Sequence, residues 1–217
     1  ADFTMQSDGE LIDLQNMCKQ PSKYAPYILF ATSLNQSVYL GYTYKKFPKE
    51  VAGYIPKGVS KRVSQRLLFN TKYLALSRNT FFYIGSLGEY LGAKDEEVSY
   101  YYMNVGLHGG FDTRLYRKYL SAFIEGGPAF QLRSLLVDRV SESGAGTKKV
   151  IGFYGNAGLK YSYPYQEDLS WVFRLGVNID SGGKTPIKLV NIDDGSEKFV
   201  NANGLFMGIA FDFGIAF

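Results

Sequence analysis

The chain has 217 residues, of which 46% are apolar, 16% are aromatic and 24 are glycine, a composition that favours one folded domain and excludes a disordered protein. No run approaches the roughly 18 consecutive apolar residues of a membrane-spanning helix, which excludes helical membrane proteins. The 24 basic and 20 acidic residues are scattered and leave a charge of +4, which argues against a nucleic-acid-binding protein.

Helical periodicity is confined to the start of the chain. Ser7 and Glu10 fit a capping box, and Pro21 would end the helix that follows. We therefore predict a short helix in an N-terminal segment, 1–36, whose apolar stripe would contact a partner or the rest of the protein. The residues of that stripe are Leu11, Leu14 and Cys18. Because there is one cysteine, no internal disulfide is expected.

From there to the C-terminus the apolar residues recur with a period of two, which is typical of strands with two unlike faces. The pattern is clearest in 205–217, where odd positions are large and apolar, and even positions other than Phe206 are Gly, Ala or Asp. Each such segment reaches the roughly 9–11 residues that a tilted strand needs to cross a bilayer. The eight predicted strands are 37–47, 62–76, 80–92, 98–111, 118–132, 149–162, 169–180 and 205–217.

The start of the first strand is ambiguous. Ile28, Phe30 and Leu34 share the parity of Val38, so the first strand could begin earlier, or 27–33 could be a separate strand. A ninth strand would place the N-terminus outside the cell, which is uncommon in bacterial barrels. We prefer eight strands.

The connections between the strands alternate in length. Long polar loops are expected at 48–61, 133–148 and 181–202, and short turns at 77–79, 112–117 and 164–168. A further short link, around Lys94, lies on the side of the long loops. Long loops on one side and tight turns on the other are typical of bacterial outer-membrane barrels. An even number of strands would place both ends of the barrel on the side of the short turns, in the periplasm.

The C-terminal segment ends in an aromatic residue preceded by alternating apolar ones, and in this it resembles the assembly signal of small eight-stranded Gram-negative outer-membrane barrels, such as the OmpA transmembrane domain, OmpX and OmpW. The resemblance covers 37–217. It implies an all-β, antiparallel, up-and-down transmembrane barrel in the outer membrane, with a periplasmic N-terminus, extracellular long loops and a removed signal peptide. It also implies that the barrel-assembly machinery reads Ile209, Phe211, Phe213, Ile215 and Phe217.

Parity places many charged side chains in the lumen. Eight strands leave an interior just wide enough for side chains, and buried charges must be paired to be tolerated. We therefore expect a lumen plugged by ion pairs. The alternative is a narrow pore, which would favour anions because basic residues outnumber acidic ones in this set. The predicted lumen residues are Lys45, Arg66, Lys72, Glu89, Glu125, Lys160, Arg174 and Asp212.

His108 is the single histidine and raises the alternative of an outer-membrane lipid-modifying enzyme. Its partners would be Ser121 or Ser86 with Glu125 or Glu89. Parity points His108 into the lumen rather than to the lipid, and no local signature accompanies it. A packed, hydrogen-bonded histidine is the preferred interpretation.

These patterns predict a non-enzymatic outer-membrane barrel that serves as a structural, adhesive or complex-forming module. The expected partners are outer-membrane lipid, lipopolysaccharide near the basic stretches 57–62 and 148–149, the assembly machinery and other envelope proteins, but no nucleic acid. The acidic stretch 191–197 lacks the spacing of a calcium loop, and we expect neither a metal nor a cofactor. A soluble lipocalin-type barrel remains an alternative, and it would turn its apolar residues inward.

Overall fold

The computed structural model describes most of the chain beyond the N-terminal segment. No described helix is long or apolar enough to cross a membrane. The described residues are 4–7, 10–13, 36–47, 49–55, 57–58, 62–77, 79–116, 119–166, 169–182, 186–201 and 205–217.

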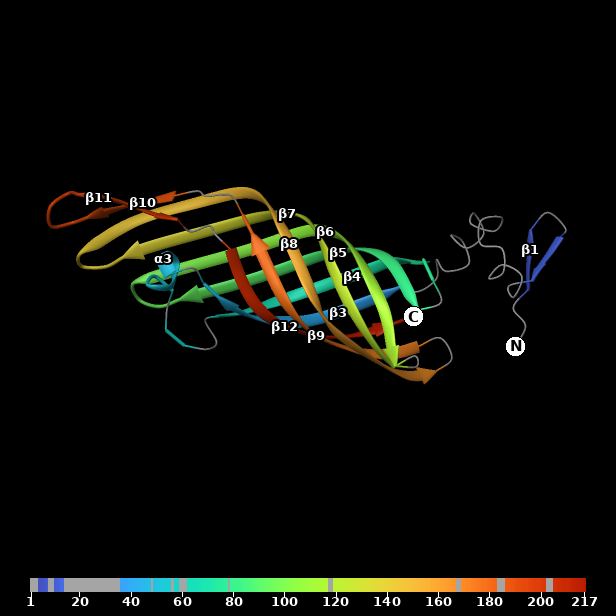
Figure 1. Ribbon diagram of the computed structural model, residues 1–217. Coiled ribbons are helices and arrows are strands. Elements are labelled where there is room, and N and C mark those ends of the chain that lie inside the picture. The colour runs from blue at the N-terminus through green and yellow to red at the C-terminus, as the bar shows by residue number, and fades with distance from the viewer. Residues whose placement is uncertain are drawn as a thin grey trace.

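The main body is a closed barrel of eight antiparallel strands, each paired with its neighbour in the sequence (Figure 1). The last strand closes the ring by pairing with both the first and the preceding barrel strand, so that Ile209 lies between Tyr44 and Val177. The eight-stranded up-and-down barrel predicted from the sequence is therefore confirmed. Its strands are β3 (Ser37–Lys46), β4 (Val63–Ala75), β5 (Thr80–Lys94), β6 (Val98–Tyr116), β7 (Leu120–Asp138), β8 (Glu142–Gln166), β9 (Leu169–Ser181) and β12 (Leu205–Ala216).

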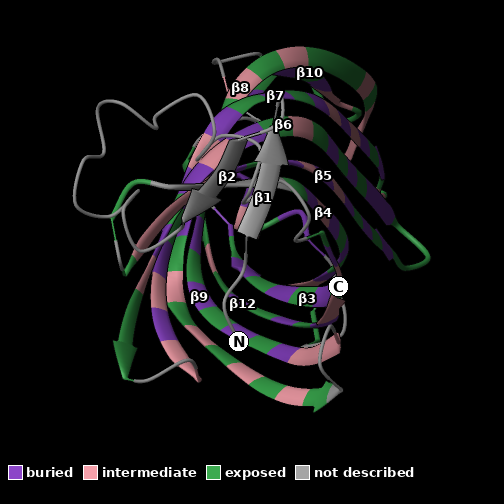
Figure 2. Ribbon diagram, turned by 90° about the vertical axis from the view of Figure 1, so that its right-hand side faces the viewer, coloured by how far each residue is buried: buried purple, intermediate pink, exposed green. Residues whose placement is uncertain are grey.

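Buried and exposed residues alternate along the barrel strands, and the alternation is visible as colour bands in Figure 2. In β3, for example, Tyr39 is buried in the lumen and the adjacent Leu40 is exposed on the outer wall. The alternation follows from the pleat of a strand, in which successive side chains point to opposite faces.

The barrel strands β6, β7 and β8 continue well beyond the barrel ring. The sequence predicted a long loop at 133–148 in this region. β7 extends to Asp138 and β8 begins at Glu142, so the predicted long loop is wrong and a tight turn takes its place. The period of two continues through this stretch because Leu135 and Val137 point inward and are buried. The side chains that cover Leu135 and Val137 come from the connections at 48–61 and 181–202.

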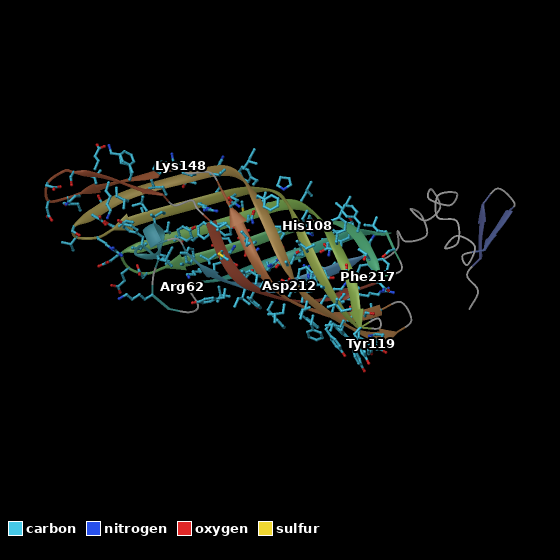
Figure 3. The ribbon with its side chains drawn as sticks, in the orientation of Figure 1. Arg62, His108, Tyr119, Lys148, Asp212 and Phe217 are labelled. Carbon is cyan, nitrogen blue, oxygen red and sulfur yellow. The ribbon has the colours of Figure 1, made fainter. Side chains whose placement is uncertain are left out.

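The connection at 181–202 forms a hairpin of β10 (Pro186–Asn191) and β11 (Glu197–Asn201), which continues the sheet beside β8. A single helical turn, α3 (Lys49–Ala52), lies in the connection at 48–61. We call the ends of β6, β7 and β8 together with β10, β11 and residues 49–55 the sheet extension. It lies at the opposite end of the molecule from Phe217 (Figure 3).

The N-terminal segment corrects a second expectation. Where the capping-box interpretation predicted a helix, β1 (Thr4–Ser7) and β2 (Glu10–Asp13) form a hairpin. The competing signal is the Asp-Gly pair at 8–9, a dipeptide that favours two-residue hairpin loops. Leu11 lies in β2, while Leu14, Cys18 and the ambiguous segment 27–33 lie outside the described residues.

Candidate functional site

The centre of the lumen is occupied by a buried carboxylate with three hydrogen-bond donors and a paired arginine. Glu125 receives Arg174 at 2.6 Å, the hydroxyl groups of Tyr83 and Tyr154 at 2.5 and 2.7 Å, and the amide of Asn156 at 3.2 Å. The donors come from strands on different sides of the barrel, so these bonds tie the walls together across the interior. Charge-assisted bonds of this kind are the strong ones in proteins.

A second carboxylate lies between two arginines. Asp212 is 3.2 Å from Nε of Arg66 and 3.9 Å from Nε of Arg174. Arg66 also donates to the hydroxyl groups of Tyr154 at 2.7 Å and Thr43 at 3.2 Å. The two arginines therefore connect both carboxylates into one network.

A third group lies closer to the sheet extension. Nζ of Lys45 bonds to Glu89 at 2.9 Å and to Asp180, and the amide of Asn104 donates to Asp180 at 3.2 Å. The ammonium group also lies 4.5 Å from the ring centre of Tyr102. One cation thus pairs with carboxylates from two strands.

Two further cations mark the ends of the lumen. Lys160 pairs with Asp112 near the short turns. Arg133, near the sheet extension, donates to Gln131 at 2.5 Å and lies 4.0 Å from the ring centre of Phe206. All of these charged groups are buried except Lys160, which is partly buried.

The charges of the described lumen balance. Five are cationic (Lys45, Arg66, Arg133, Lys160 and Arg174) and five are carboxylates (Glu89, Asp112, Glu125, Asp180 and Asp212). The excess of basic residues expected from the sequence is not found among them, because the predicted set missed two carboxylates, Asp112 and Asp180, and one cation, Arg133, and because the side chain of Lys72 is not described. Asp112 and Arg133 lie one residue beyond the predicted ends of their strands, so parity carried one residue further would have found them. Asp180 lies within its predicted strand and shares the parity of Arg174.

Lys72 is the remaining member of the predicted set. The pairing of β4 with β5 shifts register between Asn70 and Lys72, and such a bulge reverses the parity beyond it. The side chain of Lys72 lies outside the described part of the structure, so its place in the lumen stays a prediction.

His108 is buried in the lumen, in the middle of the barrel (Figure 3). Its Nε2 lies 2.9 Å from Oδ1 of Asn70 and 3.8 Å from Glu125. The carboxylate partner considered for an enzyme is thus present, but Glu125 is occupied by three other donors and by Arg174. Of the two candidate serines, Ser121 pairs across the strands with Lys160 and Ser86 lies on the outward-facing side of β5 with Ile84.

Above the network, the sheet extension encloses an apolar core. Val51 from α3, Leu135 from β7, and Ile187 and Leu189 from β10 are buried together. Phe47 packs edge-on against Tyr100 and Phe206, with ring centres 5.5 Å apart in each pair. This core fills the end of the barrel that leads away from the short turns.

Polar contacts attach residues 49–55, which carry α3, to the strands of the sheet extension. Arg139 lies 3.3 Å from Glu97 and donates to the carbonyl of Gly53 at 3.3 Å. Lys198 bonds to Glu142 at 3.3 Å and lies over the ring of Tyr54. Hydrogen bonding with Tyr54 and then with Glu142 raises the pKa of Lys198 above its ordinary value.

The outer wall of the barrel is covered by exposed apolar side chains. Leu40, Leu107 and Ile209 are 68%, 65% and 60% exposed, and comparable residues occur on every barrel strand. A continuous surface of this kind is not stable in water, and it matches a barrel with hydrocarbon outside and polar groups inside. The residues of the suggested assembly signal all belong to this wall, on one face of β12 and just beyond it: Ile209, Phe211, Phe213, Ile215 and Phe217.

In the part of the chain that the structure describes, no group of three or more His, Cys, Asp and Glu side chains is arranged to hold a metal ion. The basic residues Lys57, Lys148 and Lys149 are exposed, and Lys148 and Arg62 lie at the end of the molecule that carries the sheet extension (Figure 3).

No protein-family model and no curated protein matches the sequence. Solved structures with a similar fold include Ail, the attachment invasion locus protein of Yersinia pestis, at 10% identity over 84% of this chain and 96% of that one, with a TM-score of 0.49. A major outer membrane protein from Thermus thermophilus is 16% identical over 84% and 98% of the two chains, with a TM-score of 0.48. The outer membrane protease OmpT from Escherichia coli is 8% identical over 84% and 94%, with a TM-score of 0.45. At these levels the comparisons assign no activity to this chain.

Proposed function

We propose that the chain is a closed, non-enzymatic barrel of the bacterial outer membrane that holds the sheet extension at the cell surface as a structural, adhesive or complex-forming module. The apolar outer wall supports the membrane setting. The observation that carries the proposal is the filled interior, in which balanced charges bind one another and an apolar core lies above them. A conducting channel needs mobile, hydrated groups along its path, and the lumen offers paired ones instead.

The direction of insertion follows from the two ends of the barrel. Short turns at one end are typical of the periplasmic side, and longer connections are typical of the extracellular side. We therefore place the N-terminal segment in the periplasm, where it would dock on the rim or on another envelope protein, and the sheet extension outside. Lys148 and Lys149 would then lie near lipopolysaccharide phosphates, and the alternating face of β12 would be read by the assembly machinery.

Conductance in planar bilayers tests whether the barrel is closed. The purified protein is expected to give no stepwise current under an applied voltage, while a porin reconstituted in the same way gives regular steps. Stepwise currents that disappear when the protein is omitted would contradict the closed barrel.

Labelling of intact cells tests the orientation. An epitope inserted after Asp194, in the turn between β10 and β11, should bind antibody on intact cells. The same epitope inserted after Ser77, in the turn between β4 and β5, should bind only after the outer membrane is permeabilised. The reverse pattern would contradict the proposed orientation but not the closed barrel.

A further inference from the structure

Lys45, Asp180 and Glu89 meet in the lumen on the side of the sheet extension. We propose that Nζ of Lys45 condenses with the carboxyl group of Asp180 to form an amide bond within the chain, and that Glu89 transfers the protons. The structure shows the reactants before this bond forms. The inference goes beyond the proposed function, because a cross-link inside the barrel is a covalent modification that needs no partner.

The closure of the barrel holds the amine and the carboxyl group in contact. Nζ of Lys45 bonds to Oδ2 of Asp180, so it lies beside the carbon atom that it would attack. β12 pairs with β3 on one side and with β9 on the other, and this pairing fixes the positions of the two backbones. Two groups held in this way react as if one were present at a concentration of about 10⁵–10⁸ M in the best cases.

Two further side chains supply a proton carrier and a hydrogen-bond donor. Oε2 of Glu89 lies 2.9 Å from Nζ of Lys45, and the hydroxyl group of Ser64 holds Glu89 through a bond of 2.5 Å. The amide of Asn104 donates to Oδ1 of Asp180 at 3.2 Å. Because Oδ1 gains negative charge when the carboxyl carbon is attacked, Asn104 is placed to stabilise that charge.

The site is buried, which favours the uncharged reactants. Lys45 and Asp180 are 1% and 0% exposed, and the ring of Tyr102 lies 4.5 Å from Nζ. Burial removes the hydration of an ammonium group and of a carboxylate, and so favours the transfer of a proton from Nζ to Oδ2. The neutral amine that results is the nucleophile.

The atoms and protons of the reaction balance. The neutral nitrogen of Lys45 attacks Cγ of Asp180, and a C–N bond forms. Glu89 takes a proton from this nitrogen and passes it to Oδ2, the bond between Cγ and Oδ2 breaks, and Oδ2 leaves as water. One ammonium group and one carboxylate thus become one amide and one water molecule, and no oxidant or cofactor is required.

The charges of the lumen remain balanced after the reaction, because one cation and one carboxylate are consumed together. Glu89 keeps its bond to Ser64 and lies directly opposite Arg66 in the ladder between β4 and β5. Its negative charge therefore keeps a cationic neighbour when Lys45 becomes neutral.

The mass of the intact protein tests the proposal. The full chain, purified from outer membranes, should be lighter than its sequence by one water molecule. A protease digest should contain a branched peptide that joins the segment around Lys45 to the segment around Asp180, and trypsin should fail to cleave after Lys45. The full sequence mass, together with linear peptides at both positions, would overturn the proposal.

Three substitutions assign the roles of the side chains. Lys45→Arg keeps the positive charge but cannot form the amide, and Glu89→Gln keeps the shape but cannot carry the proton, so both variants should have the full mass. Lys160→Arg is the matched control, because Lys160 is also a partly buried lysine paired with a carboxylate, that of Asp112. This control should still lose one water molecule. A Lys160→Arg variant of full mass would overturn the assignment to Lys45, and a linked Glu89→Gln variant would overturn the role of Glu89.

Electrophoresis in SDS without heating checks that each variant is folded, since a folded barrel migrates differently from the unfolded chain. If a variant does not fold, the mass and the branched peptide of the unchanged protein still decide. After heating, the unchanged protein should migrate faster than Lys45→Arg, because the bond closes a loop between positions 135 residues apart. The conductance and cell-labelling results do not depend on this bond, so the cross-link and the closed surface barrel can fail separately.

Discussion

The barrel ring and the sheet extension are made of the same strands but bury opposite kinds of side chain. In the ring, Arg174 and Glu125 point inward while Leu175 and Ile124 cover the outside. In the extension, Leu135 points inward while Asp138 and Lys188 are exposed. β7 passes through both regions without a change in its alternation. The inward-facing side chains therefore change from charged in the ring to apolar in the extension.

The barrel ring and the sheet extension draw their stability from two different sources. The extension gains stability from apolar area removed from water. The ring cannot gain it in this way, because its outer wall remains in an apolar medium, and its cohesion depends on the strand ladder and on polar bonds across the lumen. Substitutions in the two regions should therefore lower the stability by different mechanisms and by different amounts.

The largest effect is expected from Arg174→Leu. This substitution leaves Glu125 and Asp212 with fewer cations in a buried site, and removing one partner of a buried pair costs about 3–5 kcal/mol. Urea unfolding in lipid vesicles should show a loss of that size in the free energy of unfolding. Arg114→Leu, an exposed arginine near the short turns, is the control. Equal stability of the two variants would show that the lumen network relaxes around the missing charge.

The apolar core of the extension gives the next effect. Leu135→Ala should cost about 2–5 kcal/mol, but locally, as faster protease cleavage of the extension with the ring still resistant. Leu136→Ala, the adjacent residue on the outer face, should leave the cleavage rate almost unchanged. Loss of the whole barrel in Leu135→Ala would mean that the two regions unfold as one unit.

A charge on the outer wall tests where the medium changes. Leu175→Arg should lower the stability in lipid vesicles by about 2–4 kcal/mol, as for basic residues near the bilayer midplane. Leu136→Arg should have almost no effect because that position lies in the extension. Similar costs at both positions would place the membrane boundary beyond Leu136 and remove the distinction between the two regions.

The smallest effect concerns Lys198. Its pKa is raised in the folded protein, so its contribution is present at neutral pH and is lost as the pH rises through the folded pKa, above its ordinary 10.5. Cleavage of the hairpin by an alkali-stable protease should accelerate above that pH, and Lys198→Met should remove this acceleration. The pair with Glu142 is exposed, and such pairs contribute about 0.2–1 kcal/mol. An unaltered pH profile in the variant would assign the effect to another group.

The period of two in the sequence was sufficient to predict the barrel ring. It was not sufficient to predict which charged side chains pair inside the ring. The alternation in β12 shows which side chains share a face, and that information is local to the strand. Which carboxylate meets which cation depends on the stagger of strands distant in sequence, as for Lys45 and Asp180. A register shift in the pairing of β4 with β5, between Asn70 and Lys72, also interrupts the alternation on which such a prediction depends.

The missed hairpins have a different cause. In 144–150 the inward positions include Gly144 and Gly146, where Leu189 and Ile187 of β10 approach closely. Glycine at such positions gives no apolar signal, so the strand resembles a polar loop until its partner is known. At the N-terminus, a capping box and a hairpin dipeptide overlap within four residues, and short-range patterns alone do not decide between them.

The ion pairs of the lumen have a consequence for how the barrel forms. Lys45 of β3 meets Asp180 of β9, and Arg66 of β4 meets Asp212 of β12. The early strands thus find their counter-charges on strands that are synthesised late. A half-built wall would carry some of these ions into hydrocarbon without all of their counter-charges, so we expect the lumen to reach neutrality only when the last strands join the first.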